Sequence, residues 1–397
     1  MAKIFREYLQ KLKTYDKGNI CFLLGVFLIG SAFPVGILFF LASLLISIFK
    51  NKAYFFKDRW NYPFIFVSIL LIISAIINFL NPYFAETNKN YPTSILIDLI
   101  NWLPFFICFW GFQPYVRTVK QRLIFIKVII AGSIPIFISC ILQFWFNIFG
   151  PFESLNGLVV WYQKPIQDIG GLSGLFSNQN YLGSWIIIIW PLIYYLLKKS
   201  KKKFEKSFLV LLLILNTFFL FQTSSRNALI SLFPSLIIVL GFKISLIIFF
   251  IIFGFLIAAS NGFFISSPII KSILPMNIIL KIINEYKLIN FQNFPRIIVW
   301  RFGLNFIKER PWIGWGAGSF YLLFRERGGN WNAQHLHNLP LDISYKYGLI
   351  VSITLTFTIS LILFKALRKI LAEEAISITL DKCWYASTLS ILMFQLN

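Results

Sequence analysis

The two histidines of the chain, His335 and His337, stand one residue apart. Imidazole has an ordinary pKa close to neutrality, so this pair is suited to taking and returning a proton. A His-x-His pair can also bind a metal ion, but a metal site needs further ligands, and the nearest acids, Glu326 and Asp342, complete no known metal-binding spacing. A purely structural role at the start of a helix is the third interpretation. We favour acid–base chemistry, with no metal.

Two arginines, Arg226 and Arg296, are the cations best suited to bind an anion. Arg226 lies at the junction of two apolar runs, where a charge at membrane depth is costly and indicates a function. Arg296 opens an amphipathic stretch. The planar guanidinium group matches phosphate, which favours a phosphate-bearing ligand. The alternative is that both side chains reach toward lipid headgroups.

A polar patch at residues 174–183 opens a long apolar run and contains Asn178 and Asn180. Amide side chains in this place either bond to sugar hydroxyls or cap the start of a helix. The patch is therefore a second candidate for contact with a substrate.

A glycine series, Gly314, Gly316 and Gly318, follows Pro311. Glycines let backbone amides approach an anion closely, or let the chain make a tight turn. The series does not follow a strand of a βαβ unit, so the dinucleotide-binding and P-loop interpretations fail. We favour the turn over the anion cradle.

The stretch 296–309 is the element expected to position Arg296. Its apolar residues (298, 299, 302, 306) and its polar residues (301, 305, 308, 309) recur with the spacing of an amphipathic helix. Pro311 ends that helix. We expect it to lie flat in the outer membrane–water interface, with Trp300 and Trp312 as aromatic anchors.

The composition excludes a soluble enzyme: 58% of the 397 residues are hydrophobic and 13% are charged, where soluble domains have about 25% charged residues. The mean hydropathy is +0.74. The net charge of +22 collects in short loops between apolar runs, as the positive-inside rule expects, so we assign it to the lipid bilayer and expect no nucleic acid. The four cysteines are scattered and predict neither a disulfide nor a metal site.

Apolar runs of the length of a membrane span, about 20 residues, recur along the chain. We place them at 63–80, 94–111, 123–149, 174–197, 207–222, 227–242, 244–260, 341–364 and 384–397. The run 20–49 is too long for one ordinary helix, and Gly30, Ser31 and Pro34 interrupt it, so it is predicted to be a hairpin of two helices.

The lysine-rich run 198–206 is the strongest orientation signal and should stay in the cytoplasm. The basic N-terminus then also lies inside, provided that 20–49 crosses twice, and we read that run as a retained anchor rather than a cleaved signal peptide. By the same count the outer segments are 81–93, 150–173, 223–226 and 261–340.

These runs predict an all-α polytopic integral membrane protein with about 11–12 transmembrane helices and a large outer loop between late helices. We divide the chain into N-terminal membrane helices (1–260), an outer loop with the amphipathic helix and the histidines (261–340), and C-terminal membrane helices (341–397). The run 384–397 is short for a crossing, and we expect the last helix to be incomplete.

The order of these motifs resembles the O-antigen ligase and O-antigen polymerase superfamily of bacterial envelope glycosyltransferases. The resemblance rests on the patch from Gly174 to Asn180, on Ser225-Arg226-Asn-Ala, on Arg296-x-x-x-Trp300 followed by the glycine series, and on the histidine motif. In that motif His337-Asn338 is followed by nine residues and Gly348, which matches the family pattern. Val351 departs from the last position of that pattern, and in the patch from Gly174 to Asn180 the residue Gln179 stands where the family often has proline.

The resemblance implies about twelve helices, a large outer loop and cytoplasmic termini. It implies an inverting, metal-independent transfer, without a cofactor, from an undecaprenyl-diphosphate-linked glycan to lipid A-core or to another glycan unit. The enzyme would reside in the bacterial inner membrane with its active site facing the periplasm. His337 resembles the base that activates the acceptor hydroxyl, and Arg226 and Arg296 resemble the cations that bind the diphosphate. We assign further substrate contacts to Asn178, Asn180, Arg301, His335 and Asn338.

Three alternatives stay open. The motifs do not distinguish a ligase from a polymerase, and we lean toward the ligase. A bicarbonate or solute transporter is the second, because cyanobacterial members of the superfamily carry that label. Transporters place ionisable residues near the bilayer midplane, and Asp98, within the run 94–111, favours this alternative. An inactive member of the superfamily is the third.

Overall fold

The structure, a computed structural model, describes residues 16–80, 91–260, 295–329, 333–372 and 379–396. Within these ranges the regular structure is helical apart from one two-stranded sheet, which confirms the all-α fold. The chain forms two compact units, which we describe separately. Unit 1 comprises residues 1–49, 114–288 and 370–394, and unit 2 comprises residues 50–113, 289–369 and 395–397.

Seven helical segments of the described ranges are long and apolar enough to cross a membrane: Phe33–Lys50, Asn61–Phe79, Tyr91–Gly111, Val119–Trp145, Gln179–Lys199, Lys203–Gln222 and Leu349–Ala372. Three further apolar helical stretches are shorter: Lys17–Leu28, Arg226–Leu240 and Phe242–Ile251. The chain is therefore a multi-pass membrane protein. The predicted total of about 11–12 spans relies on these stretches and on the helix Leu380–Leu396. Phe242–Ile251 belongs to the 19-residue helix Phe242–Ser260, whereas Lys17–Leu28 and Arg226–Leu240 fall below the usual length of a crossing.

Unit 1 begins with two helices where the sequence predicted a hairpin. Helix α2 (Lys17–Leu28) and helix α3 (Phe33–Phe55) are separated by a turn that contains Gly30. The ring centroids of Phe22 and Phe40 lie 5.8 Å apart, so the two helices fold back on each other. The break is confirmed, whereas a double crossing of the membrane stays a prediction.

The next helices of unit 1 are α8 (Gln113–Val116), α9 (Val119–Gly132) and α10 (Ile134–Trp145). Thr118 begins α9, because its hydroxyl oxygen accepts the Gln121 N–H at 3.2 Å in a capping box. The apolar run predicted at 123–149 is present as the segment Val119–Trp145, which consists of these last two helices, α9 and α10. A proline in the first turn of α10 has no N–H with which to continue α9.

A small hairpin follows α10. Strand β1 (Phe152–Ser154) pairs antiparallel with strand β2 (Val159–Trp161), and the short helix α11 (Ile166–Ile169) comes after it. The indole N–H of Trp161 donates to the Ser31 carbonyl at 2.6 Å. This bond holds the hairpin on the turn between α2 and α3.

The remaining helices of unit 1 are α12 (Gln179–Lys199), α13 (Lys203–Gln222), α14 (Arg226–Leu240), α15 (Phe242–Ser260) and α22 (Leu380–Leu396). Helix α12 packs against both α13 and α14. Gly183 permits the close approach to α14, since a Cβ there would lie 2.9 Å from the Ala228 Cβ. The Ser235 hydroxyl bonds to the Ala386 carbonyl and joins α14 to α22.

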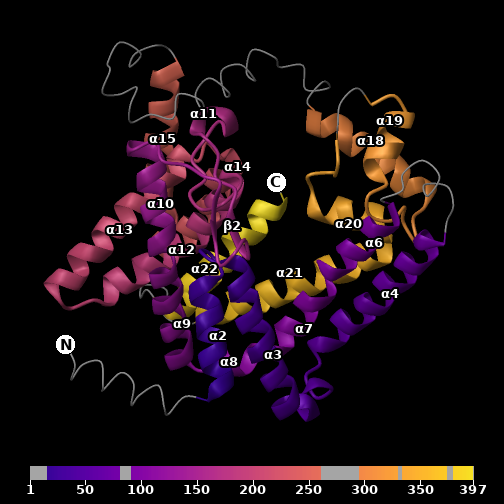
Figure 1. Ribbon diagram of the computed structural model, residues 1–397, viewed down its shortest axis with the longest axis horizontal. Coiled ribbons are helices and arrows are strands. Elements are labelled where there is room, and N and C mark those ends of the chain that lie inside the picture. Colours follow the sequence, from indigo (N-terminus) through magenta and orange to yellow (C-terminus); the bar gives the residue numbers. More distant parts are fainter. Residues whose placement is uncertain (1–15, 81–90, 261–294, 330–332, 373–378, 397) are drawn as a thin grey trace. The chain divides into compact units, whose positions relative to one another are not determined.

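Unit 2 combines an early and a late part of the chain. Its helices are α4 (Asn61–Phe79), α6 (Tyr91–Ile100), α7 (Leu103–Gly111), α18 (Pro295–Glu309), α19 (Phe320–Glu326), α20 (Leu339–Tyr347) and α21 (Leu349–Ala372). Figure 1 shows α18, α19 and α20 side by side, in orange. The predicted amphipathic helix is α18, and its bounds agree with the expectation within one residue.

The core of unit 2 is an aromatic cluster beneath α18. The Phe306 ring lies 6.0 Å from the Phe320 ring and 6.0 Å from the Tyr345 ring. The Phe320 and Phe324 rings stack at 5.8 Å. All four side chains are buried, which ties α18, α19 and α20 into one rigid body that can position side chains at its surface.

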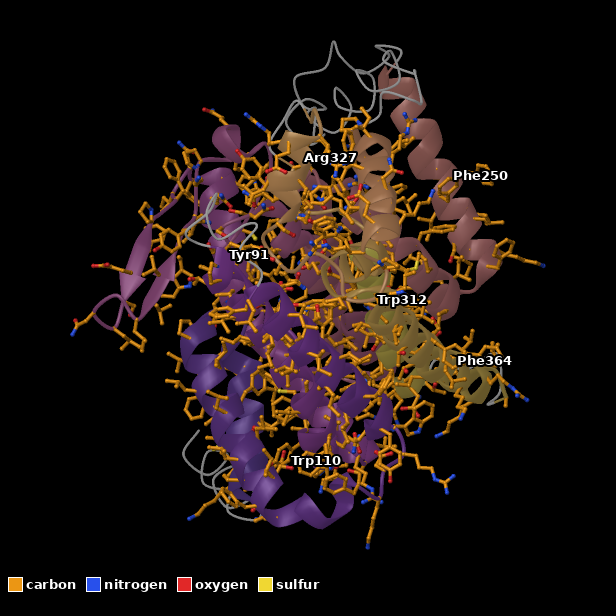
Figure 2. The ribbon with its side chains drawn as sticks, turned by 90° about the vertical axis from the view of Figure 1, so that its right-hand side faces the viewer. Tyr91, Trp110, Phe250, Trp312, Arg327 and Phe364 are labelled. Carbon is orange, nitrogen blue, oxygen red and sulfur yellow. The ribbon has the colours of Figure 1, made fainter. Side chains whose placement is uncertain are left out.

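Large apolar side chains also cover the outside of the long helices. Ile69 of α4 and Phe357 of α21 are 52% and 66% exposed. Phe364 of α21 projects outward in Figure 2. In a water-soluble protein these surfaces would be an aggregation hazard, whereas on a membrane-spanning helix they face lipid.

Candidate functional site

The segment that carries both histidines is fixed through the residue between them. Leu336 is fully buried, and its N–H donates to Asp342 Oδ1 at 3.2 Å. Its carbonyl accepts the indole N–H of Trp300 at 2.8 Å. Its side chain lies on Gly303 of α18, where an added Cβ would stand 2.3 Å from the leucine. Both backbone groups and the side chain of Leu336 are therefore held by α18 and α20.

The two histidines flank this buried leucine and are exposed. The ring centroids of His335 and His337 lie 4.1 Å apart. His337 has φ +52°, a left-handed conformation that costs a non-glycine residue roughly 1–3 kcal/mol and persists where the surroundings fix it. The fixed Leu336 supplies that constraint. The short distance between the two rings places both imidazoles on the same side of the segment.

The environment of His337 favours its neutral form. Desolvation by packed neighbours lowers the pKa of His337, and the positive charges of His335 and Arg296 lower the pKa further. The carboxylate of Asp342 acts in the opposite direction but does not outweigh them. At neutral pH the imidazole can therefore accept a proton. Arg296 is therefore close enough to His337 for its charge to act on the imidazole.

Helix α20 explains the spacing of the histidine motif. Asn338 is its N-cap, with the side-chain oxygen accepting the Leu341 N–H at 3.2 Å, and Gly348 is its C-cap. The nine residues between them form the whole helix. Gly348 has φ 92° and ψ 166°, a region that essentially only glycine adopts, and a Cβ there would lie 2.1 Å from the Trp312 carbonyl oxygen.

The glycine series forms a turn, which is the interpretation that we favoured, and amide N–H groups of this turn donate to backbone carbonyls of α20. The Trp315 N–H donates to the Tyr345 carbonyl at 2.9 Å, and the Gly316 N–H donates to the Lys346 carbonyl at 3.0 Å. A Cβ at Gly316 would lie 2.7 Å from the Tyr91 hydroxyl. The glycines thus let this turn pack between α20 and α6, and these amides are not available to cradle an anion.

Helix α18 carries Arg296 and Trp300 on one face and Arg301 on another. Arg296 and Trp300 are four residues apart, so they lie one above the other on the same face of the helix. Trp300 bonds Leu336, and Arg296 is the cation near His337. Arg301 is exposed and five residues from Arg296, which turns it to another face of the helix. Trp300 is thus bonded within the site rather than serving only as an interfacial anchor, whereas Trp312 is 67% exposed.

Unit 1 holds the other predicted residues, Asn178, Asn180 and Arg226. The Asn178 side chain caps α12 by accepting the Asn180 N–H at 2.7 Å. The Asn180 side-chain oxygen accepts the Ser225 hydroxyl at 2.8 Å. Ser225 in turn is the N-cap of α14 and accepts the Ala228 N–H. Of the two interpretations of the polar patch, capping is the one that Asn178 fulfils.

Arg226 is the first residue of α14, beside these caps. The turn before it is held by the Leu172 N–H, which donates to the Gln222 carbonyl at 2.8 Å, and by Gly171, which lies against Thr223. A helix N-terminus favours negative charge, and a guanidinium group there adds to that preference. The local setting of Arg226 fits an anion.

The predicted residues therefore fall into two groups. Arg296, Arg301, His335, His337 and Asn338 belong to unit 2, and Asn178, Asn180 and Arg226 belong to unit 1. No third His, Cys, Asp or Glu joins the histidine pair as a metal cluster among the residues that the structure describes.

Sequence reasoning missed two residues of the histidine site. Trp300 was assigned to the interface, and Asp342 was considered only as a metal ligand. The signal for Trp300 was its position one turn after Arg296. The signal for Asp342 was an acid in the first turn of a helix that directly follows the histidines, where a carboxylate can accept backbone N–H groups.

Comparison with known proteins agrees with the motif order. Residues 208–356 match the model of the O-antigen ligase family. This region contains Arg226, Arg296 and His337, and it leaves out the patch at 174–183. The match confirms the resemblance to the O-antigen ligase and polymerase superfamily. No curated protein and no solved structure matches the chain.

Proposed function

We propose that this chain, whose residues 208–356 match the O-antigen ligase family, transfers a glycan from a lipid diphosphate carrier to an acceptor hydroxyl. The observation that carries the proposal is the setting of His337: its backbone is held in a strained conformation, and burial together with the positive charges of His335 and Arg296 lowers the pKa of its imidazole. A base and a phosphate-binding cation are the two groups that such a transfer requires when no metal takes part.

The reaction begins with the acceptor. His337 takes the proton of the acceptor hydroxyl, and the oxygen attacks the anomeric carbon of the donor. The bond from that carbon to the phosphate oxygen breaks, and the diphosphate leaves with the electron pair, so the configuration inverts. A positioned base contributes about 10²–10⁴-fold to the rate of such a step.

The leaving diphosphate gains negative charge as its bond breaks. A guanidinium group held in place stabilises that charge more in the transition state than water does. Arg296, which acts on His337 electrostatically, is the cation assigned to this role in unit 2. Arg226, at the first turn of α14, keeps its predicted role as a phosphate-binding cation.

The finer assignments follow the family resemblance. The donor is a glycan on undecaprenyl diphosphate, and the acceptor is lipid A-core, with another glycan unit as the polymerase alternative. The protein resides in the bacterial inner membrane, and the site faces the periplasm. Asn178, Asn180, Arg301, His335 and Asn338 keep their predicted roles as substrate contacts.

The transporter alternative loses its main support. Asp98 was the ionisable residue in a membrane span that favoured it. The Asp98 carboxylate accepts the Tyr347 hydroxyl at 2.5 Å and pairs with Lys346 Nζ at 3.3 Å. A carboxylate engaged in this way is bound in the fold, whereas a transport site must release its ion.

The test is the envelope glycan ladder on a gel, in a deletion strain complemented with wild type, His337→Ala or Arg327→Gln. Arg327 is the matched control because its exposed ion pair with Glu309 lies outside the proposed machinery. Membrane protein levels are measured by immunoblot. We expect loss of the ladder with His337→Ala and a normal ladder with Arg327→Gln.

The pattern of loss separates the alternatives. Loss of all capped glycan indicates a ligase, and capping by single units indicates a polymerase. A normal ladder with the His337→Ala variant at normal protein level refutes the base assignment. A ladder unchanged by the deletion itself refutes glycan transfer, and bicarbonate uptake is then the measurement to make.

A further inference from the structure

A largely buried charge cluster in unit 2 contacts the histidine segment through the Leu336 N–H and is not used by the proposed chemistry. Lys346 Nζ stands between two carboxylates, 2.8 Å from Asp342 Oδ2 and 3.3 Å from Asp98 Oδ1. The three side chains are only 15–19% exposed. Asp98 comes from α6, and the other two residues come from α20, so the cluster joins two parts of the chain that are far apart in sequence.

Each carboxylate of the cluster has a second partner. Asp98 Oδ2 accepts the Tyr347 hydroxyl at 2.5 Å. Asp342 Oδ1 accepts the Leu336 N–H at 3.2 Å, while its other oxygen faces Lys346. A continuous series of contacts therefore runs from α6 through the ammonium group to the backbone of the residue that precedes His337.

The ammonium group is charged in this place. Burial lowers the pKa of Lys346, but the carboxylates of Asp342 and Asp98 outweigh it and raise the pKa above its ordinary value. A charged ammonium between two carboxylates fixes the rotamers of both, because a carboxylate that turns away leaves its own largely buried charge without this partner. Asp342 is thus held in the one orientation in which it binds the Leu336 N–H.

We propose that Lys346 and Asp98 are positioning residues for His337, acting through Asp342 and the Leu336 N–H. This inference rests on the proposed function only for its effect on catalysis. Loss of Lys346 frees Asp342, releases one of the two backbone bonds of Leu336, and lets the strained His337 relax. A base displaced by about 1 Å loses on the order of 10²-fold in rate.

The cluster also acts on the charge of His337. The charged and titratable groups that act on His337 are His335, Arg296 and Asp342. The negative charge of Asp342 is partly neutralised by Lys346. Removing Lys346 strengthens the effect of Asp342 and raises the pKa of His337, so the acid limb of the pH profile moves to higher pH.

The variants are Lys346→Met, which removes the charge at similar length, and Lys346→Arg, which keeps it. Lys308→Met is the matched control, because Lys308 is exposed on α18. Two measurements are made on the purified full chain in lipid nanodiscs. The first is amide hydrogen exchange over residues 333–338. The second is glycan transfer from a lipid-diphosphate-linked donor as a function of pH.

We expect Lys346→Met to raise exchange at the Leu336 amide at least tenfold. We expect it to lower kcat by about 10–100-fold, with a smaller change in KM, and to shift the acid limb to higher pH. Lys346→Arg should recover most of kcat, and Lys308→Met should match wild type in both measurements. A purely structural role would lower the amount of folded protein without shifting the pH profile.

Unchanged exchange at Leu336 in Lys346→Met overturns the proposal, whatever the activity. Raised exchange with an unchanged kcat and pH profile also overturns it, because the segment then moves without affecting the base. If wild type transfers no glycan, the proposed function has failed, and exchange at Leu336 still decides whether the cluster holds the histidine segment.

Discussion

Trp300 offers the most direct test of how the histidine segment is held. Its indole N–H donates to the Leu336 carbonyl at 2.8 Å. Trp300 stands four residues after Arg296, which places both residues on one face of α18. Trp300→Phe keeps an aromatic ring and removes the donor. Trp312→Phe is the matched control, because Trp312 follows on the same stretch of chain and is 67% exposed.

The size of the effect follows from the contacts of Leu336. A buried acceptor that loses its donor costs about 1–3 kcal/mol, and Leu336 is fully buried. The left-handed backbone of His337 stores roughly 1–3 kcal/mol of strain, so only a small free-energy difference favours the held conformation over a relaxed one. A net change of about 1.4 kcal/mol in favour of relaxed conformations lowers the active fraction about tenfold.

The assay is glycan transfer by purified protein at equal concentration, with thermal unfolding measured on the same samples. We expect Trp300→Phe to lower kcat/KM about tenfold, chiefly through kcat, since the base moves more than the bound donor. We expect Trp312→Phe to stay within twofold of wild type. The free energies of unfolding of the two variants should differ by less than the change that removal of a core side chain causes.

Equal activity of Trp300→Phe and wild type refutes the reasoning, because Leu336 would then be held without the indole. An equal loss in both tryptophan variants also refutes it, because the effect would come from interfacial anchoring rather than from the bond to Leu336.

Three further outcomes are expected. Gly348→Ala should strongly reduce the folded protein recovered from membranes, because the added Cβ meets the Trp312 carbonyl oxygen at 2.1 Å and φ is 92°; recovery at wild-type level would contradict this account. Asp342→Asn should move the acid limb of the pH profile of transfer to lower pH, since Asp342 is the group that raises the pKa of His337, and a shift to higher pH would contradict the assigned field. Arg226→Gln should abolish transfer and Arg226→Lys should retain part of it, as measured by the glycan ladder. Full activity of Arg226→Gln would contradict the phosphate-binding role and favour contact of Arg226 with lipid headgroups.

Local patterns in the sequence were enough to predict much of this protein. Apolar runs predicted the long helices, the spacing of residues 296–309 predicted α18, and Gly30 predicted the break between α2 and α3. The histidine motif predicted the segment at which α20 begins. These features depend on periodicity, chain-breaking residues and helix caps, all of which act over a few neighbouring residues.

The tertiary structure alone decided which helices belong together. In a membrane chain the faces toward lipid and toward other helices are both apolar, so hydrophobic pattern does not indicate which helix packs on which. Helices α4 and α6 pack with α18–α20 in unit 2, although the chain between them belongs to unit 1. Asp98 and Lys346 therefore meet across 248 positions of sequence.

The hydrogen-bond partners of the polar side chains could likewise not be predicted from the sequence. The side chain of Asp342 could have bound a metal ion, and the indole of Trp300 could have faced the interface, because each residue type is compatible with several partners. Packing selected Leu336 as the partner of both. A hydrogen bond needs two groups at about 3 Å with the right direction, and that condition is set by the folded arrangement of the helices rather than by residue type.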